Sequence, residues 1–107
     1  SVGAADSRVP SHVYSGGYLE PEELAALDGE GVVGDVATVF YRLDGSTRGI
    51  ELNDRATGPR FDVLRRVPSR VCIVSGVDKR DSLRGALAAR LVTELVVDEA
   101  TARALTE

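Results

Sequence analysis

The last third of the chain constrains the fold most, because two short apolar runs flank a helical pattern. The runs are Val71–Val74 and Leu95–Val97, and about residues 81–92 lie between them as a predicted helix. Four apolar residues share one face of this helix: Leu83, Ala86, Leu87 and Leu91. A strand, a helix and a strand of these lengths predict a crossover unit with two parallel strands, which we expect to be buried on both faces.

The flanking segments predict the remaining helices. Pro21 at a first helical position, acids in the first turn and a closing glycine predict a helix over residues 20–29. Apolar residues at helical spacing predict a short helix over residues 60–67, which ends before Pro68. Asp98 is expected to cap a last helix, Glu99–Leu105.

A β-hairpin is predicted in the middle of the chain. Residues 32–43 are rich in β-branched and aromatic side chains, and in residues 48–52 the apolar Ile50 and Leu52 alternate with other residues. Asp44-Gly45 between these two runs is a typical hairpin turn. A short strand near Gly3 is expected before a loop to residue 18, and residues 53–59 are expected to form another loop.

Composition limits the class of protein. The chain has 107 residues, 43% of them hydrophobic, and a formal net charge of -4, which fits one domain with one core. The acidic balance disfavours binding of this segment alone to nucleic acid, and no apolar run approaches the roughly 20 residues that span a bilayer. No signal-peptide pattern is present, and the single Cys72 resembles a buried hydrophobe, so we expect a cytoplasmic protein.

The loop after the first parallel strand is the first candidate site. Lys79, the only lysine among 13 basic residues, follows Gly76 at the carboxyl end of that strand, where ligands gather in open α/β sheets. An amine, bare backbone amides and a helix N-terminus suit an anion such as a phosphate, or a sugar oxygen. The alternative is a solvated Lys79 and a Gly76 that only forms a turn.

Asp35 is the second candidate, as an acceptor for sugar hydroxyls or as a cap of a turn. His12 is the only histidine, so a metal site or a Ser-His-Asp arrangement is not expected, and no cofactor is implied. Gly16-Gly17 lacks the strand and helix of a phosphate-binding pattern and is interpreted as a turn.

Several motifs resemble those of a known family in their order and spacing. The resemblance runs from about Gly3 to Leu105. They are Gly29–Val36 with its Val-Gly-Asp, Leu43–Gly45, Leu52–Arg55, the Gly-x-x-Lys loop Ser75–Lys79, and Val97–Leu105 with its Asp-Glu-Ala-Thr-Ala-Arg. This set resembles the C-terminal sugar-binding domain of the SorC/DeoR family of bacterial transcriptional regulators.

The resemblance implies an α/β fold, namely the parallel-sheet half of a sugar-phosphate isomerase/CoA-transferase-like (NagB/RpiA-like) domain with an inserted β-hairpin. Residues 1–107 resemble the second half of the effector domain, and the chain is interpreted as a fragment of a longer protein. The helix-turn-helix that binds DNA and the loop that holds the effector's phosphate are expected upstream. A homo-oligomer, dimer or tetramer, is also implied.

The family's effector-binding residues match four positions of this sequence. The resemblance implies that Lys79, with Gly76, contacts the phosphate or an oxygen of a phosphorylated sugar. It also implies that Asp35 accepts the sugar's hydroxyls, beside the backbone near Ala37. Sugar binding is then expected to shift domain and subunit packing and so change operator affinity.

Two rival hypotheses remain. An isomerase-like enzyme fragment is chemically possible, since Lys79 could form a Schiff base, but the sequence predicts no His, Cys or second carboxylate converging on its loop as acid or base. We therefore expect no catalytic residues. Alternatively, the segment serves chiefly as an oligomerisation half-domain, with the effector held by the other half.

Overall fold

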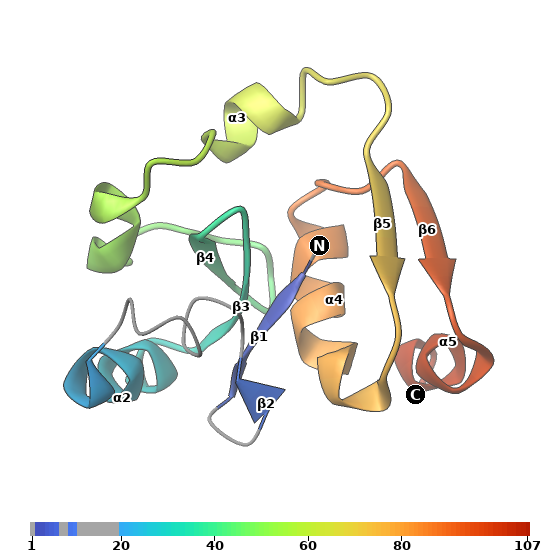
Figure 1. Cartoon of the computed structure of the whole chain (residues 1–107), viewed down its shortest axis with the longest axis horizontal. Coiled ribbons are helices and arrows are strands. Elements are labelled where there is room, and N and C mark those ends of the chain that lie inside the picture. The colour runs from blue at the N-terminus through green and yellow to red at the C-terminus, as the bar shows by residue number, and fades with distance from the viewer. Residues whose placement is uncertain (1, 7–8, 11–19) are drawn as a thin grey trace.

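Helix α4 (Arg80–Ala88) lies between two groups of strands in the computed structural model, which describes residues 2–6, 9–10 and 20–107 (Figure 1). One group is an antiparallel sheet in the order β2-β1-β3-β4, and the other is the parallel pair β5-β6. His12 and Gly16-Gly17 lie outside the described residues. The strands are β1 (Gly3–Asp6), β2 (Val9–Pro10), β3 (Val32–Val36), β4 (Val39–Arg42), β5 (Val71–Val74) and β6 (Glu94–Val97).

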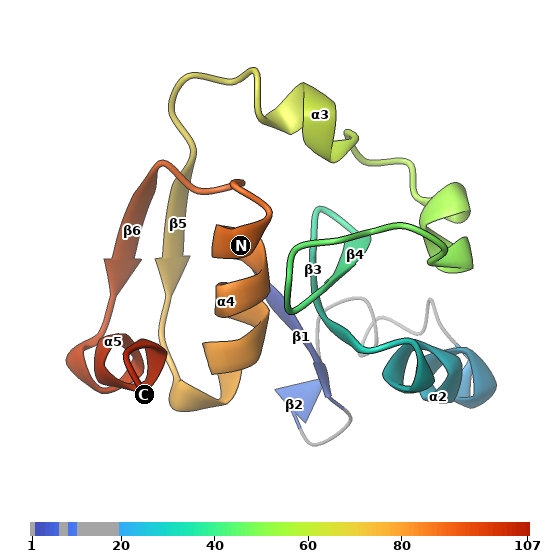
Figure 2. The same ribbon diagram turned by 180° about the vertical axis from the view of Figure 1, so that it is seen from behind.

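The remaining helical segments surround these layers, as both views show (Figure 2). The predicted helices before the hairpin and after Asp98 are confirmed. The helix before Pro68 is also present, but it ends at Leu64 and not at residue 67. Two short 3-10 turns are additional. These helical segments, in chain order, are α2 (Pro21–Gly29), the 3-10 helix η1 (Glu51–Arg55), α3 (Phe61–Leu64), the 3-10 helix η2 (Val77–Lys79) and α5 (Glu99–Leu105). No helix in the described part of the chain is long and apolar enough to cross a membrane.

The crossover unit is confirmed, with β5 and β6 parallel on either side of α4 in sequence. The helix is shorter than predicted, because it ends at Ala88 and Arg90 has a φ of 57°, which breaks the helical path. Leu91 is still buried in the main core, and its N–H donates to the carbonyl of Ala86 at 3.2 Å. The expected burial of both sheet faces is wrong: Cys72 is buried, but Ile73 on the opposite face is exposed.

The predicted hairpin turn is also wrong. The turn between β3 and β4 is Ala37-Thr38, whose φ values of 51° and 69° are left-handed. Asp44-Gly45 does form a turn, with the Gly45 N–H donating to the carbonyl of Arg42 at 2.8 Å, but no second strand follows it. This hairpin is therefore part of the antiparallel sheet, which it shares with β1, and not an insertion into a parallel one.

A side chain takes the place of that missing strand. The Asn53 amide accepts from the Phe40 N–H at 2.7 Å and donates to the Phe40 carbonyl at 2.9 Å, so it pairs with β4 as a backbone would. Residues 51–55 fold as η1 around it, and Ile50 instead packs with Leu27, Val32 and Phe40 in a small second core. The apolar alternation in residues 48–52 thus reflects burial and not a strand.

Helix α4 packs closely on the hairpin because glycines stand at the contact. A Cβ on Gly34 would lie 2.6 Å from the Cβ of Ser82, and one on Gly85 would lie 2.6 Å from the Tyr41 ring. Tyr41 is fully buried between these elements and its ring lies 6.1 Å from that of Phe61. The position of α4 therefore depends on two residues without side chains.

We predict that Gly85→Ala destabilises the protein by about 1–3 kcal/mol, because the added methyl overlaps the Tyr41 ring and the Arg42 carbonyl. The matched control is Gly29→Ala at the end of α2, where a Cβ meets nothing within 4 Å. Urea unfolding of both variants measures the difference. Equal stability of the two would contradict this account of the packing.

Candidate functional site

The carboxyl ends of the two parallel strands meet at one edge, where the η2 loop follows β5 and Asp98 follows β6 (Figures 1 and 2). Gly76 has a φ of 118°, a backbone conformation open to glycine and strained for other residues. Its N–H donates to Oδ1 of Asp98 at 3.2 Å and to Oγ1 of Thr101 at 3.0 Å. The loop after β5 is thus fastened to the start of α5.

Asp98 is the residue at this edge whose second role the sequence did not reveal. Its carboxylate caps α5, as predicted, by accepting from the N–H of Thr101, and it also accepts from the Thr101 hydroxyl at 2.6 Å. These bonds, with that from Gly76, lower the pKa of Asp98 to about 2. The expectation of a bare amide at Gly76 is therefore not met, because an ionised carboxylate already accepts from it.

Lys79 extends from this edge toward β1. Its Nζ donates to the carbonyl of Val2 at 2.8 Å, and its side chain is partly exposed. An ammonium has three N–H donors, and within the described residues this one forms no ion pair. The amine therefore has further N–H donors for another acceptor.

Asp35 lies on the other side of the same stretch of β1, paired in register with Gly3. It is buried, with 7% of its surface exposed. Burial and the nearby Asp35 charge together raise the pKa of Tyr41, so this phenol stays protonated and acts as a donor.

A chain of hydrogen bonds joins the hairpin to the lysine. The Tyr41 hydroxyl donates to the carbonyl of Ser82 at 2.6 Å, and the Ser82 hydroxyl donates to the carbonyl of Lys79 at 3.0 Å. The fold therefore brings Lys79 and Asp35 to the same end of β1, from segments 44 positions apart. Ala37 lies beyond Asp35 in the hairpin turn, where a Cβ on Gly58 would come within 2.3 Å of its carbonyl oxygen.

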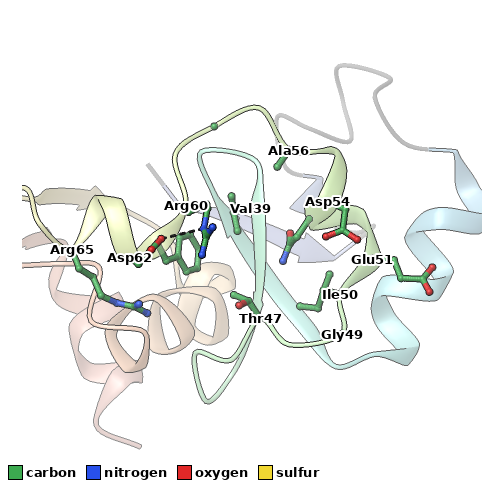
Figure 3. Close-up of a pocket in the computed structure, with 13 residues that line it drawn as sticks. Val39, Thr47, Gly49, Ile50, Glu51, Asp54, Ala56, Arg60, Asp62 and Arg65 are labelled. Carbon is green, nitrogen blue, oxygen red and sulfur yellow. Dashed lines mark ion pairs between the residues drawn. The ribbon is translucent and has the colours of Figure 1, made fainter.

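The structure also contains a cleft of about 590 Å³ that the sequence did not predict and that includes none of the four candidate residues. It lies between β4, η1 and α3 (Figure 3). Arg60 and Asp62 at its rim form an ion pair with N–O distance 3.3 Å, and the Nε of Arg65 donates to the carbonyl of Ala89. The sequence predicted only a loop over residues 53–59 in this region. Within the described residues, no group of His, Cys, Asp or Glu could hold a metal ion.

Comparison with known proteins decides the family. The family model Sugar-bind, described as "Putative sugar-binding domain", matches residues 1–107. The chain belongs to this sugar-binding domain family. This match, together with the relatives described next, confirms the resemblance to the sugar-binding domains of bacterial transcriptional regulators.

Three similar proteins illustrate the relationship. The structure of a domain of a possible sugar-binding transcriptional regulator from Arthrobacter aurescens is 51% identical, with a TM-score of 0.88, over 99% of this chain and 40% of that chain. Transcriptional regulator LsrR from Klebsiella pneumoniae is 30% identical over 97% of this chain and 32% of its own length. The full-length sorbitol operon regulator SorC from Klebsiella pneumoniae shares the fold, with a TM-score of 0.84 at 24% identity over 99% of this chain and 34% of that chain. The chain thus spans about a third of the length of LsrR.

We predict that the sugar-binding domain loses stability between about pH 4 and pH 2, in part through Asp98. Its pKa is about 2 in the folded state against an ordinary value of 3.8, so its contribution is complete above pH 4 and is lost as the pH falls through 2. Asp98→Asn should flatten this acid limb, whereas Asp78→Asn, an exposed change in the η2 loop, should not. Thermal unfolding of both variants across this pH range measures the loss of stability. Identical pH profiles of the two variants would refute the role of Asp98.

Proposed function

We propose that the chain is the effector-sensing part of a sugar-responsive transcriptional regulator, and that it binds a phosphorylated sugar at the end of β1. The observation that carries this proposal is the Lys79 ammonium, partly exposed and without an ion pair in the described part of the chain. Membership of a sugar-binding domain family supports a sugar as the ligand.

Each candidate residue has a role that its chemistry supports. Lys79 contacts the phosphate or a sugar oxygen through the donors that Val2 does not use. Gly76 forms the turn that positions the loop carrying Lys79. Asp35 accepts hydrogen bonds from the hydroxyls of the sugar, with the backbone at Ala37 beside it. Because Asp35 is only 7% exposed, the sugar reaches it at the edge where β1 begins.

Control of DNA binding follows from differential affinity. A sugar changes operator affinity only if the two conformations of the regulator bind the sugar differently. In this proposal the DNA is bound by another part of the protein, which acts in the cytoplasm as a homo-oligomer. The hydrogen bonds that join the backbone carbonyl of Lys79 through Ser82 to Tyr41 support the coupling, because they tie the segment that carries the lysine to the sheet.

The NagB/RpiA-like architecture remains part of the proposal, and the enzyme alternative has less support. A carboxylate does approach the loop, contrary to the sequence-based expectation, since Asp98 accepts from the Gly76 N–H. That carboxylate is held in the cap of α5 by Thr101, which does not suit an acid or base that moves protons. LsrR and the Arthrobacter protein are described as regulators.

We predict that Lys79→Ala weakens binding of a phosphorylated sugar by tenfold or more in the full-length protein, because a charged hydrogen bond contributes about 1.5–3 kcal/mol. A panel of pentose and hexose phosphates is first screened for the compound that raises the melting temperature of the protein. Titration calorimetry with that compound then measures the affinity. Unchanged affinity would overturn the assignment of Lys79.

The matched control is Arg60→Ala, which removes an exposed cation from the cleft beside α3. We expect it to leave sugar affinity within twofold of the parent protein. A large loss with Arg60→Ala and none with Lys79→Ala would move the site to that cleft. Conversion of the sugar during the titration would favour the enzyme.

A further inference from the structure

The cleft between β4, η1 and α3 has an apolar floor. Val39, Ile50 and Phe61 line it, and they are buried, with 9%, 3% and 6% of their surfaces exposed. Its volume of about 590 Å³ falls within the range of small-molecule sites, roughly 300–1,000 Å³, which are typically apolar with a few well-placed polar groups. The cleft therefore has the size and the floor of a binding site, and the polar groups around it decide which ligand it accepts.

Both walls of the cleft are fixed by hydrogen bonds within the chain. On the η1 wall, the side-chain amide of Asn53 bonds twice to the backbone of Phe40, at 2.7 and 2.9 Å. On the α3 wall, the Nε of Arg65 donates to the carbonyl of Ala89 at 2.8 Å. A ligand that enters a cleft with fixed walls costs little conformational entropy, because few groups remain to be ordered.

Charges of opposite sign lie on the two sides of the cleft (Figure 3). Arg60, Asp62 and Arg65 lie on the α3 side, whereas Glu51 and Asp54 lie on the η1 side. Arg60 and Asp62 form an ion pair with each other at 3.3 Å, so each neutralises the other. The α3 side thus keeps the positive charge of Arg65, and the lining of the η1 side is negative.

Arg65 and Asp54 both have hydrogen-bonding groups to spare. Of the Arg65 guanidinium, only Nε has a partner among the described residues, so the donors of its two terminal nitrogens remain. In the same part of the chain, no ion pair engages the Asp54 carboxylate. A guanidinium binds a carboxylate through two parallel hydrogen bonds, and a carboxylate accepts from an ammonium. Together these groups match a molecule that carries both charges.

We infer that this cleft binds a small zwitterion, a molecule whose carboxylate and ammonium are joined by a short apolar body. The carboxylate pairs with Arg65, the ammonium pairs with Asp54, and the apolar body covers Val39 and Ile50. The cleft includes none of the four residues proposed to contact the sugar, so it is a second site. The inference stands whether or not Lys79 binds a sugar.

Titration calorimetry of the full-length protein with ε-aminocaproate tests the inference. Caproate and hexylamine are matched probes, because they have the same number of carbons and each lacks one of the two charged groups. We expect ε-aminocaproate to bind at least about tenfold more tightly than either probe, since each of its ends forms a charged hydrogen bond. Equal affinities of the three compounds, or no binding of ε-aminocaproate at millimolar concentrations, would overturn the inference.

A substitution at Asp54 tests whether the ligand lies in this cleft. We expect Asp54→Asn to weaken binding of ε-aminocaproate by about fivefold or more, because it removes the charge that pairs with the ammonium. Asp54 is exposed, so the variant keeps the fold. The matched control is Asp78→Asn, which removes an exposed carboxylate in the η2 loop, outside the cleft. Equal affinities of the two variants would contradict the assignment.

Competition separates this cleft from the proposed sugar site. A saturating sugar phosphate should leave the affinity for ε-aminocaproate unchanged, since the two ligands contact different residues. Displacement of ε-aminocaproate by the sugar phosphate would show one shared site and overturn the inference. If no sugar phosphate binds, the proposed sugar site fails, whereas the cleft is still decided by the ε-aminocaproate titration and by Asp54→Asn.

Discussion

The close approach of α4 to the β3-β4 hairpin is the constraint on which the other elements depend. It requires a backbone without side chains at Gly34 and Gly85, with the Tyr41 ring filling the space between them. Since α4 also carries the connection from β5 to β6, its position sets where the parallel pair lies relative to the antiparallel sheet. The Tyr41 hydroxyl adds a buried hydrogen bond to this contact by donating to the carbonyl of Ser82 in the first turn of α4.

Local signals in the sequence predicted the helices well. Pro21 and Asp98 mark helix starts by mechanisms that act within a few residues, so α2 and α5 were predicted within a residue of their observed bounds. The hairpin turn was misplaced because Ala37-Thr38 adopts left-handed angles without a glycine or asparagine to reveal them. The end of α4 was missed because Leu91 continues the apolar spacing after the helix has stopped.

The candidate site could be predicted only in part. The position of Lys79 at the end of a parallel strand followed from the topology, but its bond to Val2 joins residues 77 positions apart and leaves no trace in either segment. The same holds for Gly76 and Asp98, which are 22 positions apart. The cleft beside α3 is defined by how β4, η1 and α3 lie relative to one another, which spacing along the chain does not encode.

The bond between Lys79 and the Val2 carbonyl means that an anion bound as proposed above would share one ammonium with the chain just before β1. The same amine would then hold the anion through one N–H donor and the Val2 carbonyl through another. Val2 directly precedes the strand that pairs with Asp35. Occupancy of the amine would thus tie the ligand to one end of the antiparallel sheet.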